Sequence, residues 1–383
     1  MVPHGIQSVL LPYLLAIQLQ QPAQRFGITL MLGQLPMFLL LLVGGWLADR
    51  VDARRLLMGL QAAGVVVPLL LALALWQGAV TELMVMLYAL AWGLVSAFAT
   101  PARDGLLKRV AAGNVQKMVT QATGIQFATQ MIGQLVAGSA GRVGAITILL
   151  LQCTVLALGI YVATHLPKGR SQVSTGARGS FGQELGAGLK LLFADPTLRA
   201  TFTIIIGMGV FFTGVFLVLI PIALRDLYNG SAPDIAFGFV VFGLGTLTSI
   251  VAIMRGGGIS RSGRALAISM FSGCAALLPM MLAPPLWLFY GCIFLWGMSG
   301  GVGMTMSRSI MQELAPVSHQ SRVMAAFSLA TAGGAPLGSL LMGTVIALVG
   351  ARWAVAIPIV GVMTTTLAVL VSHPIWQFVS RSK

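Results

Sequence analysis

The stretch that decides the fold reads Gly44-Gly45-Trp46-Leu47-Ala48-Asp49-Arg50-Val51-Asp52-Ala53-Arg54-Arg55. It holds two carboxylates and three guanidiniums, whereas the runs before it (28–43) and after it (56–80) carry no charge. A single charge near the centre of a bilayer costs about 2.5 to 3.5 kcal/mol on insertion scales. We therefore expect this cluster in a tight turn at a membrane surface and a spanning helix on either side of it.

The composition points the same way. Hydrophobic residues make up 57% of the 383 residues and charged residues 8%, against about 25% charged residues in soluble proteins. These values exclude a soluble globular protein and predict an all-α polytopic membrane protein. The net charge of +14 is explained by basic loops rather than by nucleic-acid binding. Cys153, Cys274 and Cys292 fall in apolar runs without metal-ligand spacing, so no metal and no cofactor is expected.

Twelve segments meet the requirement of about 20 mainly apolar residues for a spanning helix. The first begins at Met1 with no basic residue before it, and we expect it to be shortened at its amino-terminal end. The expected segments are 2–20, 27–48, 56–77, 82–100, 115–140, 143–165, 198–224, 233–254, 264–283, 286–306, 319–347 and 350–373.

The charges test this count. With twelve segments, alternate loops place nineteen of the 23 Lys and Arg residues on one side and four on the other. The basic side of a membrane protein is the cytoplasmic side, so both termini are expected inside.

A long polar stretch divides the chain. We expect a six-helix half at 1–166, a cytoplasmic linker with an amphipathic helix at 167–197, and a second six-helix half at 198–383. A shift of 205 residues pairs Arg50 with Arg255, Arg103 with Arg308 and Gly133 with Gly338. The two halves are therefore expected to be repeats.

The loop sequence Gly45-x-Leu47-Ala48-Asp49-Arg50-x-x-x-Arg54-Arg55 resembles the signature that the major facilitator superfamily carries between segments 2 and 3. Asp52 stands where that family usually has glycine, and this spelling is most similar to bacterial exporters of the enterobactin-siderophore type. The resemblance implies twelve helices in two pseudo-symmetric halves, a substrate site at the midplane and alternating access. It also implies a monomer in the lipid of the bacterial inner membrane.

The resemblance assigns a conformational gate to the cytoplasmic end of segment 2. There, Asp49 is expected to meet an arginine of segment 4 and a helix end of the other half. The alternative is that these charges only mark the turn and set topology. The gate residues are Gly45, Asp49, Arg50, Arg54 and Arg103.

Segment 5 carries Gln126, Gln130 and Gln134 on one helical face. Amides facing lipid would stay unpaired at a cost of several kcal/mol, so this face is expected to look inward. It would line a substrate cavity or join helices by hydrogen bonds. By resemblance, Trp92, Tyr290 and Trp296 also line the cavity, with packing as the alternative.

Four small or helix-bending residues are typical of the family's exporters: Gly133, Gly138, Pro336 and Gly338. They allow close helix contact and bending, so we expect hinge roles at the contacts of segments 5 with 8 and 2 with 11, or static packing. His4 is the candidate proton site because no acidic residue is expected at membrane depth.

The sequence favours a secondary transporter that exports a siderophore or another amphipathic small molecule, with protons as a possible coupling ion. Multidrug efflux, a metabolite importer of the same fold and a transport-inactive paralogue stay open as alternatives. The chain has no Gly-x-x-x-x-Gly-Lys-Ser/Thr loop for ATP and no constellation of catalytic residues, so an enzyme is not expected.

Overall fold

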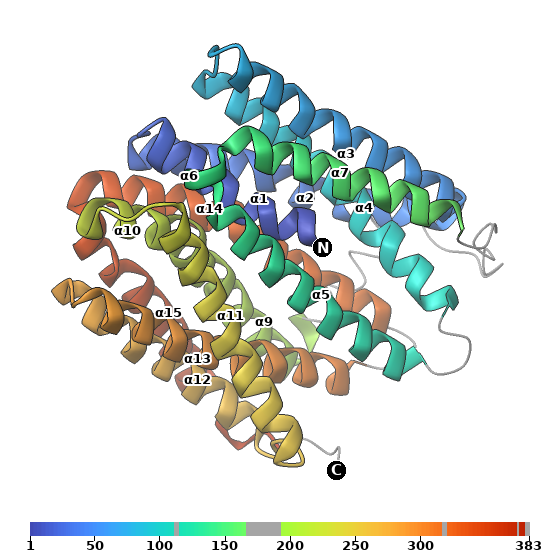
Figure 1. Cartoon of the computed structure of the whole chain (residues 1–383). Helices are drawn as coiled ribbons and strands as arrows, with labels where there is room; N and C mark the ends of the chain where they lie inside the picture. The colour runs from blue at the N-terminus through green and yellow to red at the C-terminus, as the bar shows by residue number, and fades with distance from the viewer. Residues whose placement is uncertain (111–114, 166–192, 316–319, 374, 380–383) are drawn as a thin grey trace. The chain divides into compact units, whose positions relative to one another are not determined.

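The computed structural model describes residues 1–110, 115–165, 193–315, 320–373 and 375–379, and every regular element in them is helical (Figure 1). The chain divides into two compact units. Unit 1 comprises Met1–Gly176 and Asn229–Phe237, and unit 2 comprises Ala177–Tyr228 and Gly238–Lys383.

Unit 1 pairs helices that are distant in sequence. The first helix, α1, packs against α5, α2 packs against α4, and α3 packs against both α4 and α7. A π-helical turn, η1, continues α1. The bounds are α1 (Val2–Tyr13), η1 (Leu14–Gln18), α2 (Ala23–Arg50), α3 (Ala53–Trp76), α4 (Glu82–Val110), α5 (Val115–Gly138), α6 (Ala140–Val143) and α7 (Ala145–Thr164).

Unit 2 repeats this plan with a more distorted first helix. Two π-helical turns, η2 and η3, interrupt the segment from α9 to α10, and α14 packs against both turns. The bounds are α9 (Pro196–Gly207), η2 (Met208–Phe212), η3 (Val215–Leu219), α10 (Ile220–Tyr228), α11 (Ala232–Arg255), α12 (Ser262–Leu277), η4 (Leu278–Leu282), α13 (Leu286–Leu314), α14 (Gln320–Ala354), α15 (Ala356–Ser372) and η6 (Ile375–Gln377). The first residues of α11 belong to unit 1.

Among the described residues, eight helices are long and apolar enough to cross a membrane. They confirm the prediction of an all-α polytopic membrane protein. The helix Ala356–Ser372 is apolar but shorter. The eight are Arg54–Trp76, Glu82–Arg103, Ala145–Thr164, Pro196–Tyr228, Ala232–Arg255, Ser262–Leu282, Leu286–Leu314 and Ala326–Ala354.

The turn predicted at 44–55 is much shorter than expected. Helix α2 continues through the motif to Arg50, and α3 begins at Ala53. Two residues suffice because Asp52 caps α3: its Oδ1 accepts the backbone N–H groups of Arg54 at 2.9 Å and Arg55 at 3.3 Å. An acidic side chain at this position satisfies amides that have no partner inside the helix.

Other predicted boundaries also move. Helix α4 continues to Val110 and α13 to Leu314, so Arg103 lies within a helix rather than in a loop. The break between the eleventh and twelfth segments is a kink at Gly350, whose φ of 79° suits glycine. The predicted amphipathic helix of the 167–197 linker lies outside the described residues.

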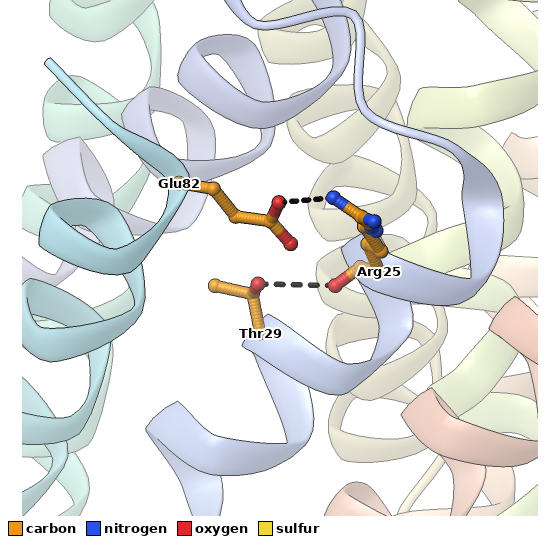
Figure 2. A network of polar contacts seen from close by, with 3 residues as sticks. All are labelled: Arg25, Thr29 and Glu82. Carbon is orange, nitrogen blue, oxygen red and sulfur yellow. Dashed lines mark hydrogen bonds and ion pairs between the residues drawn. The ribbon is translucent and has the colours of Figure 1, made fainter.

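An ion pair joins the beginnings of α2 and α4. Arg25 Nη1 lies 2.7 Å from Glu82 Oε2, and the Thr29 hydroxyl donates to the Arg25 carbonyl oxygen at 3.0 Å (Figure 2). In unit 2, the Tyr228 hydroxyl donates to the Pro284 carbonyl oxygen at 2.6 Å. Tyr228 ends α10 and Pro284 precedes α13, so in each unit a residue beside the first loop bonds to the start of the fourth segment.

Candidate functional site

In unit 1, α1 and α5 meet backbone to backbone. A Cβ atom added at Gly5 would overlap the carbonyl oxygen of Gln130, and one added at Gly133 would overlap the carbonyl oxygen of Val2. Only glycine permits this approach. It brings the polar residues of α1 against the glutamine face of α5.

Hydrogen bonds connect α1 to its neighbours. Gln134, which is buried, donates from Nε2 to the Ser8 hydroxyl at 3.3 Å. The Tyr88 hydroxyl of α4 donates to Gln7 Oε1, and both residues are buried. Gln152 of α7 is fully buried, and its Nε2 donates to the Pro3 carbonyl oxygen at 3.5 Å. We call Gln7, Ser8, Tyr88, Gln134 and Gln152 the amide set.

The remaining glutamines of α5 lie further along the same face. Gln126 is half-buried, and with its amide oxygen turned toward Arg103 it accepts from Nη2 at 3.1 Å and from Nη1 at 3.3 Å. Gln130 is also half-buried. The prediction that this face looks toward other helices agrees with these contacts. Arg103 is held by α5 as well as by the Met1 sulfur at 3.0 Å.

Trp92 and His4 are neighbours. The two rings lie 5.6 Å apart, edge to face, and Trp92 is buried while His4 is half-buried. The roles predicted for them, in the cavity and in proton transfer, stay predictions. One helical turn from Trp92, Tyr88 is among the residues of α3 and α4 that line an apolar hollow of about 300 Å³. Tyr88 thus lines this hollow and also donates its hydroxyl hydrogen bond to Gln7.

Unit 2 repeats the close backbone contact twice. A Cβ atom at Gly338 of α14 would overlap the carbonyl oxygen of Val210, and one at Gly334 would overlap the backbone of Gly209. Pro336 lies between them and is buried. The absence of side chains at these glycines lets α14 pack closely against the two π-helical turns, η2 and η3.

The side chains beside this contact are aromatic. The Trp296 ring lies 5.6 Å from that of Phe212 and 4.7 Å from that of Phe242, and the Phe216 ring lies 4.8 Å from that of Phe242. Trp296 is 2% exposed, and its indole Nε1 has no hydrogen-bond partner among the described residues. We call Phe212, Phe216, Phe242 and Trp296 the aromatic set. Tyr290, which was predicted to line the cavity together with Trp296, is half-buried. Its ring centre lies 6.3 Å from the ring centre of Phe289.

Most of the predicted gate cannot be placed at the level of side chains. Gly45, Asp49 and Arg50 belong to α2, but their side chains lie outside the described part of the chain. Arg54 donates from Nη2 to the carbonyl oxygen of Thr164 and so joins α3 to the end of α7. The gating role of these residues stays a prediction.

Gly133 and Gly338 contact the first helix of their own unit, a contact that the sequence did not predict. Gly138 does meet the eighth segment: an added Cβ would lie 2.7 Å from the Cβ of Ala236, at the start of α11 within unit 1. The predicted hinge roles of these glycines and Pro336 are not tested by static contacts.

The carboxylates of the described side chains lie at helix ends: Asp52, Glu82, Asp195, Asp226, Asp234 and Glu313. In the same part of the chain, no group of three His, Cys, Asp or Glu residues could hold a metal ion. Among these described side chains, the polar and aromatic groups inside the units are amides, hydroxyls and rings rather than carboxylates.

Sequence reasoning identified Gln134, Trp92 and Trp296 but missed most of their partners. Gln152 sits alone in an apolar segment, and the spacing of Phe212 and Phe216 is that of any packed helix. The contact of Gln7 with Tyr88 spans 81 residues. One available signal was the pair of adjacent polar residues, Gln7 and Ser8, inside an otherwise apolar run.

A family model described as Major Facilitator Superfamily matches residues 3–339 and 264–381. The chain belongs to the major facilitator superfamily. This confirms the family inferred from the motif at 45–55. No protein of curated function matches the sequence.

Solved structures with this fold include two kinds of transporter. The nucleoside transporter NupG matches with a TM-score of 0.76 at 12% identity, over 97% of this chain and 96% of that chain. A POT family transporter in complex with 5-aminolevulinic acid matches with a TM-score of 0.75 at 13% identity, over 98% and 93%. At these identities the likeness shows the fold alone.

Proposed function

We propose that this member of the superfamily is a secondary active transporter that exports an amphipathic small molecule, such as a siderophore, by alternating access. The observation that carries the proposal is the difference between the amide set of unit 1 and the aromatic set of unit 2. Hydrogen-bonding groups and aromatic rings are the two kinds of contact that an amphipathic substrate with polar groups and a ring can make. Amides supply hydrogen bonds, and aromatic rings stack with centroids 4.5–7 Å apart.

The charges favour this substrate class over a charged metabolite. A fixed charge inside a membrane protein is expensive unless an opposite charge accompanies it. The carboxylates with described side chains all lie at helix ends, so none of these six places a negative charge in the interior of its unit. An importer of cationic or zwitterionic metabolites would need such charges.

Multidrug efflux is the second candidate, and the aromatic set favours it. Phenyl and indole faces accept rings of many shapes without the directional demands of hydrogen bonds. A transporter that relies mainly on this set would be tolerant of its substrate. One that relies mainly on the amide set would be selective.

The test uses inside-out vesicles that contain the protein, with a panel of catecholate siderophores and cationic dyes. Uptake is measured with and without a proton gradient, and Asp49→Asn vesicles of equal protein content serve as the control. We expect gradient-dependent uptake of at least one compound by the wild type and loss of it in Asp49→Asn. Uptake of the same compound into right-side-out vesicles only would show import and overturn the proposed direction.

A further inference from the structure

We propose that the loop between α11 and α12, together with Trp376, binds the phosphate headgroup of an anionic membrane phospholipid. The arginines are Arg255 at the end of α11, Arg261 in the loop and Arg264 in the first turn of α12, and all three are exposed. None of the three forms an ion pair with a carboxylate of the described residues. The inference concerns the membrane partner of this surface and does not depend on which substrate is transported.

The repeat shows how unusual this loop is. The shift of 205 residues aligns it with the loop between α2 and α3, and it pairs Arg50 with Arg255. The same shift pairs Asp49 with Met254 and Asp52 with Gly257. The second loop has therefore kept an arginine and has no carboxylate to balance it.

Helix α12 begins without the capping carboxylate that α3 has. Asp52 caps α3 with its carboxylate, whereas Arg261 stands at the cap of α12 and makes no side-chain capping bond. The Gly263 N–H instead donates to the Phe378 carbonyl oxygen of the C-terminal segment at 3.4 Å. Gly257 and Gly258, with φ of 74° and 93°, turn the chain tightly between the two helices. The positive end of the helix dipole and the arginines thus add to each other.

A partly exposed tryptophan, Trp376, contacts the charged loop region through Arg264. The Arg264 guanidinium lies 5.0 Å from the centre of the Trp376 ring, and the indole is 39% exposed. Tryptophan is enriched at the boundary between headgroups and hydrocarbon. This stack holds the guanidinium at the depth where a phosphate would lie.

Apolar side chains continue the surface on the helices that flank the loop. Met254 precedes Arg255 and is 65% exposed, and Ile268 follows Arg264 by one turn and is 47% exposed. A free phosphate would not use them, but the acyl chains of a phospholipid would. The charge of the loop and this apolar surface together fit a lipid rather than a soluble anion.

The test titrates the full-length protein, delipidated in detergent, with dioleoylphosphatidylglycerol or dioleoylphosphatidylcholine and counts bound lipids by native mass spectrometry. We compare Arg261→Gln/Arg264→Gln with Arg142→Gln/Arg199→Gln, which removes two exposed arginines of other helices. We expect tight phosphatidylglycerol binding, weakened more than about tenfold in the first variant and unchanged in the second.

Two further arms complete the test. Arg261→Lys/Arg264→Lys keeps the charges and should recover most of the lost affinity, which separates a binding defect from misfolding. Inorganic phosphate at the lipid concentration should not displace phosphatidylglycerol. Equal lipid binding by the wild type and Arg261→Gln/Arg264→Gln would overturn the proposal. Displacement by inorganic phosphate would also overturn it, because the site would then take a soluble anion.

Discussion

The two units use the same backbone contact and different side chains. Gly133 and Gly338 lie 205 residues apart, and each packs against the first helix of its own unit. Beside Gly133 lie the hydroxyl and amide groups of Ser8 and Gln134, which bond at 3.3 Å. Beside Gly338 lie η2 and η3, which carry Phe212 and Phe216 of the aromatic set.

This difference separates two properties of the repeat. The glycines fix how closely two helices approach, which requires the absence of a side chain and leaves little freedom in sequence. The side chains next to these glycines decide what the surface recognises. They can differ between the two units because the glycines themselves permit the close approach of the helices. The fold is therefore repeated while the chemistry is not.

The largest expected effect comes from filling the shared contact. Gly133→Ala and Gly338→Ala should each lower the free energy of unfolding by about 1–3 kcal/mol or more, because the new Cβ overlaps a backbone carbonyl that cannot move alone. Thermal unfolding of the purified protein in detergent measures this. Gly124→Ala in α5 is the matched control, since nothing lies within 4 Å of its Cβ. Equal melting temperatures for all three variants would show that the contact is loose.

Removing a polar pair should have a smaller effect, and only in unit 1. Gln134→Leu and Tyr88→Phe break the bonds to Ser8 and Gln7. Such bonds between membrane helices are worth about 0.6–2 kcal/mol. Each variant should lower the unfolding free energy by this amount, with additivity in the double variant if the two bonds are independent. A stability gain in either variant would contradict the role given to the amide set.

The two loops should respond differently to loss of their capping residue. Asp52→Ala should destabilise the protein by about 1 kcal/mol, because two backbone N–H groups of α3 lose their acceptor. Arg261→Ala should leave stability unchanged, since Arg261 makes no capping bond. Chemical unfolding of both variants measures the difference. A larger loss in Arg261→Ala than in Asp52→Ala would reverse this comparison of the loops.

The smallest effect is expected at the Arg25–Glu82 ion pair between the starts of α2 and α4. The Arg25 side chain is 62% exposed, and exposed ion pairs contribute about 0–1 kcal/mol. Arg25→Gln should therefore shift the melting temperature little, and less still in high salt. Tyr228→Phe removes a hydrogen bond at a half-buried position and should cost about 0.5–1.5 kcal/mol. A larger loss of stability in Arg25→Gln than in Tyr228→Phe would show that the ion pair is better shielded from water than its exposure indicates.

Much of the fold could be predicted from the sequence. The uncharged run after Asp49 and Arg50 predicted the spanning helix Arg54–Trp76, and the motif itself identified the family. The helix ends were less predictable. The early start of α3 at Ala53 depends on the Asp52 cap, and the turns η1, η2 and η3 have no clear sequence signal.

The candidate site was predictable only in part. The inward face of α5 followed from the spacing of its glutamines, because amides avoid lipid. Their partners did not follow, since Ser8 is 126 residues from Gln134 and Phe212 belongs to a helix that reads as plain apolar sequence. Such contacts arise from the tertiary packing that Gly5, Gly133 and Gly338 allow.

The most direct test of the account is gradient-dependent uptake into inside-out vesicles by the wild type, Gln134→Leu and Trp296→Leu over one panel of catecholate siderophores and cationic dyes. We predict uptake by the wild type and intact membrane insertion of both variants. Trp296→Leu should raise the KM for ring-bearing compounds about two- to tenfold, the value of one aromatic contact, and Gln134→Leu should impair uptake of the most polar compounds. Absence of wild-type uptake, or wild-type behaviour of both variants, would contradict the account.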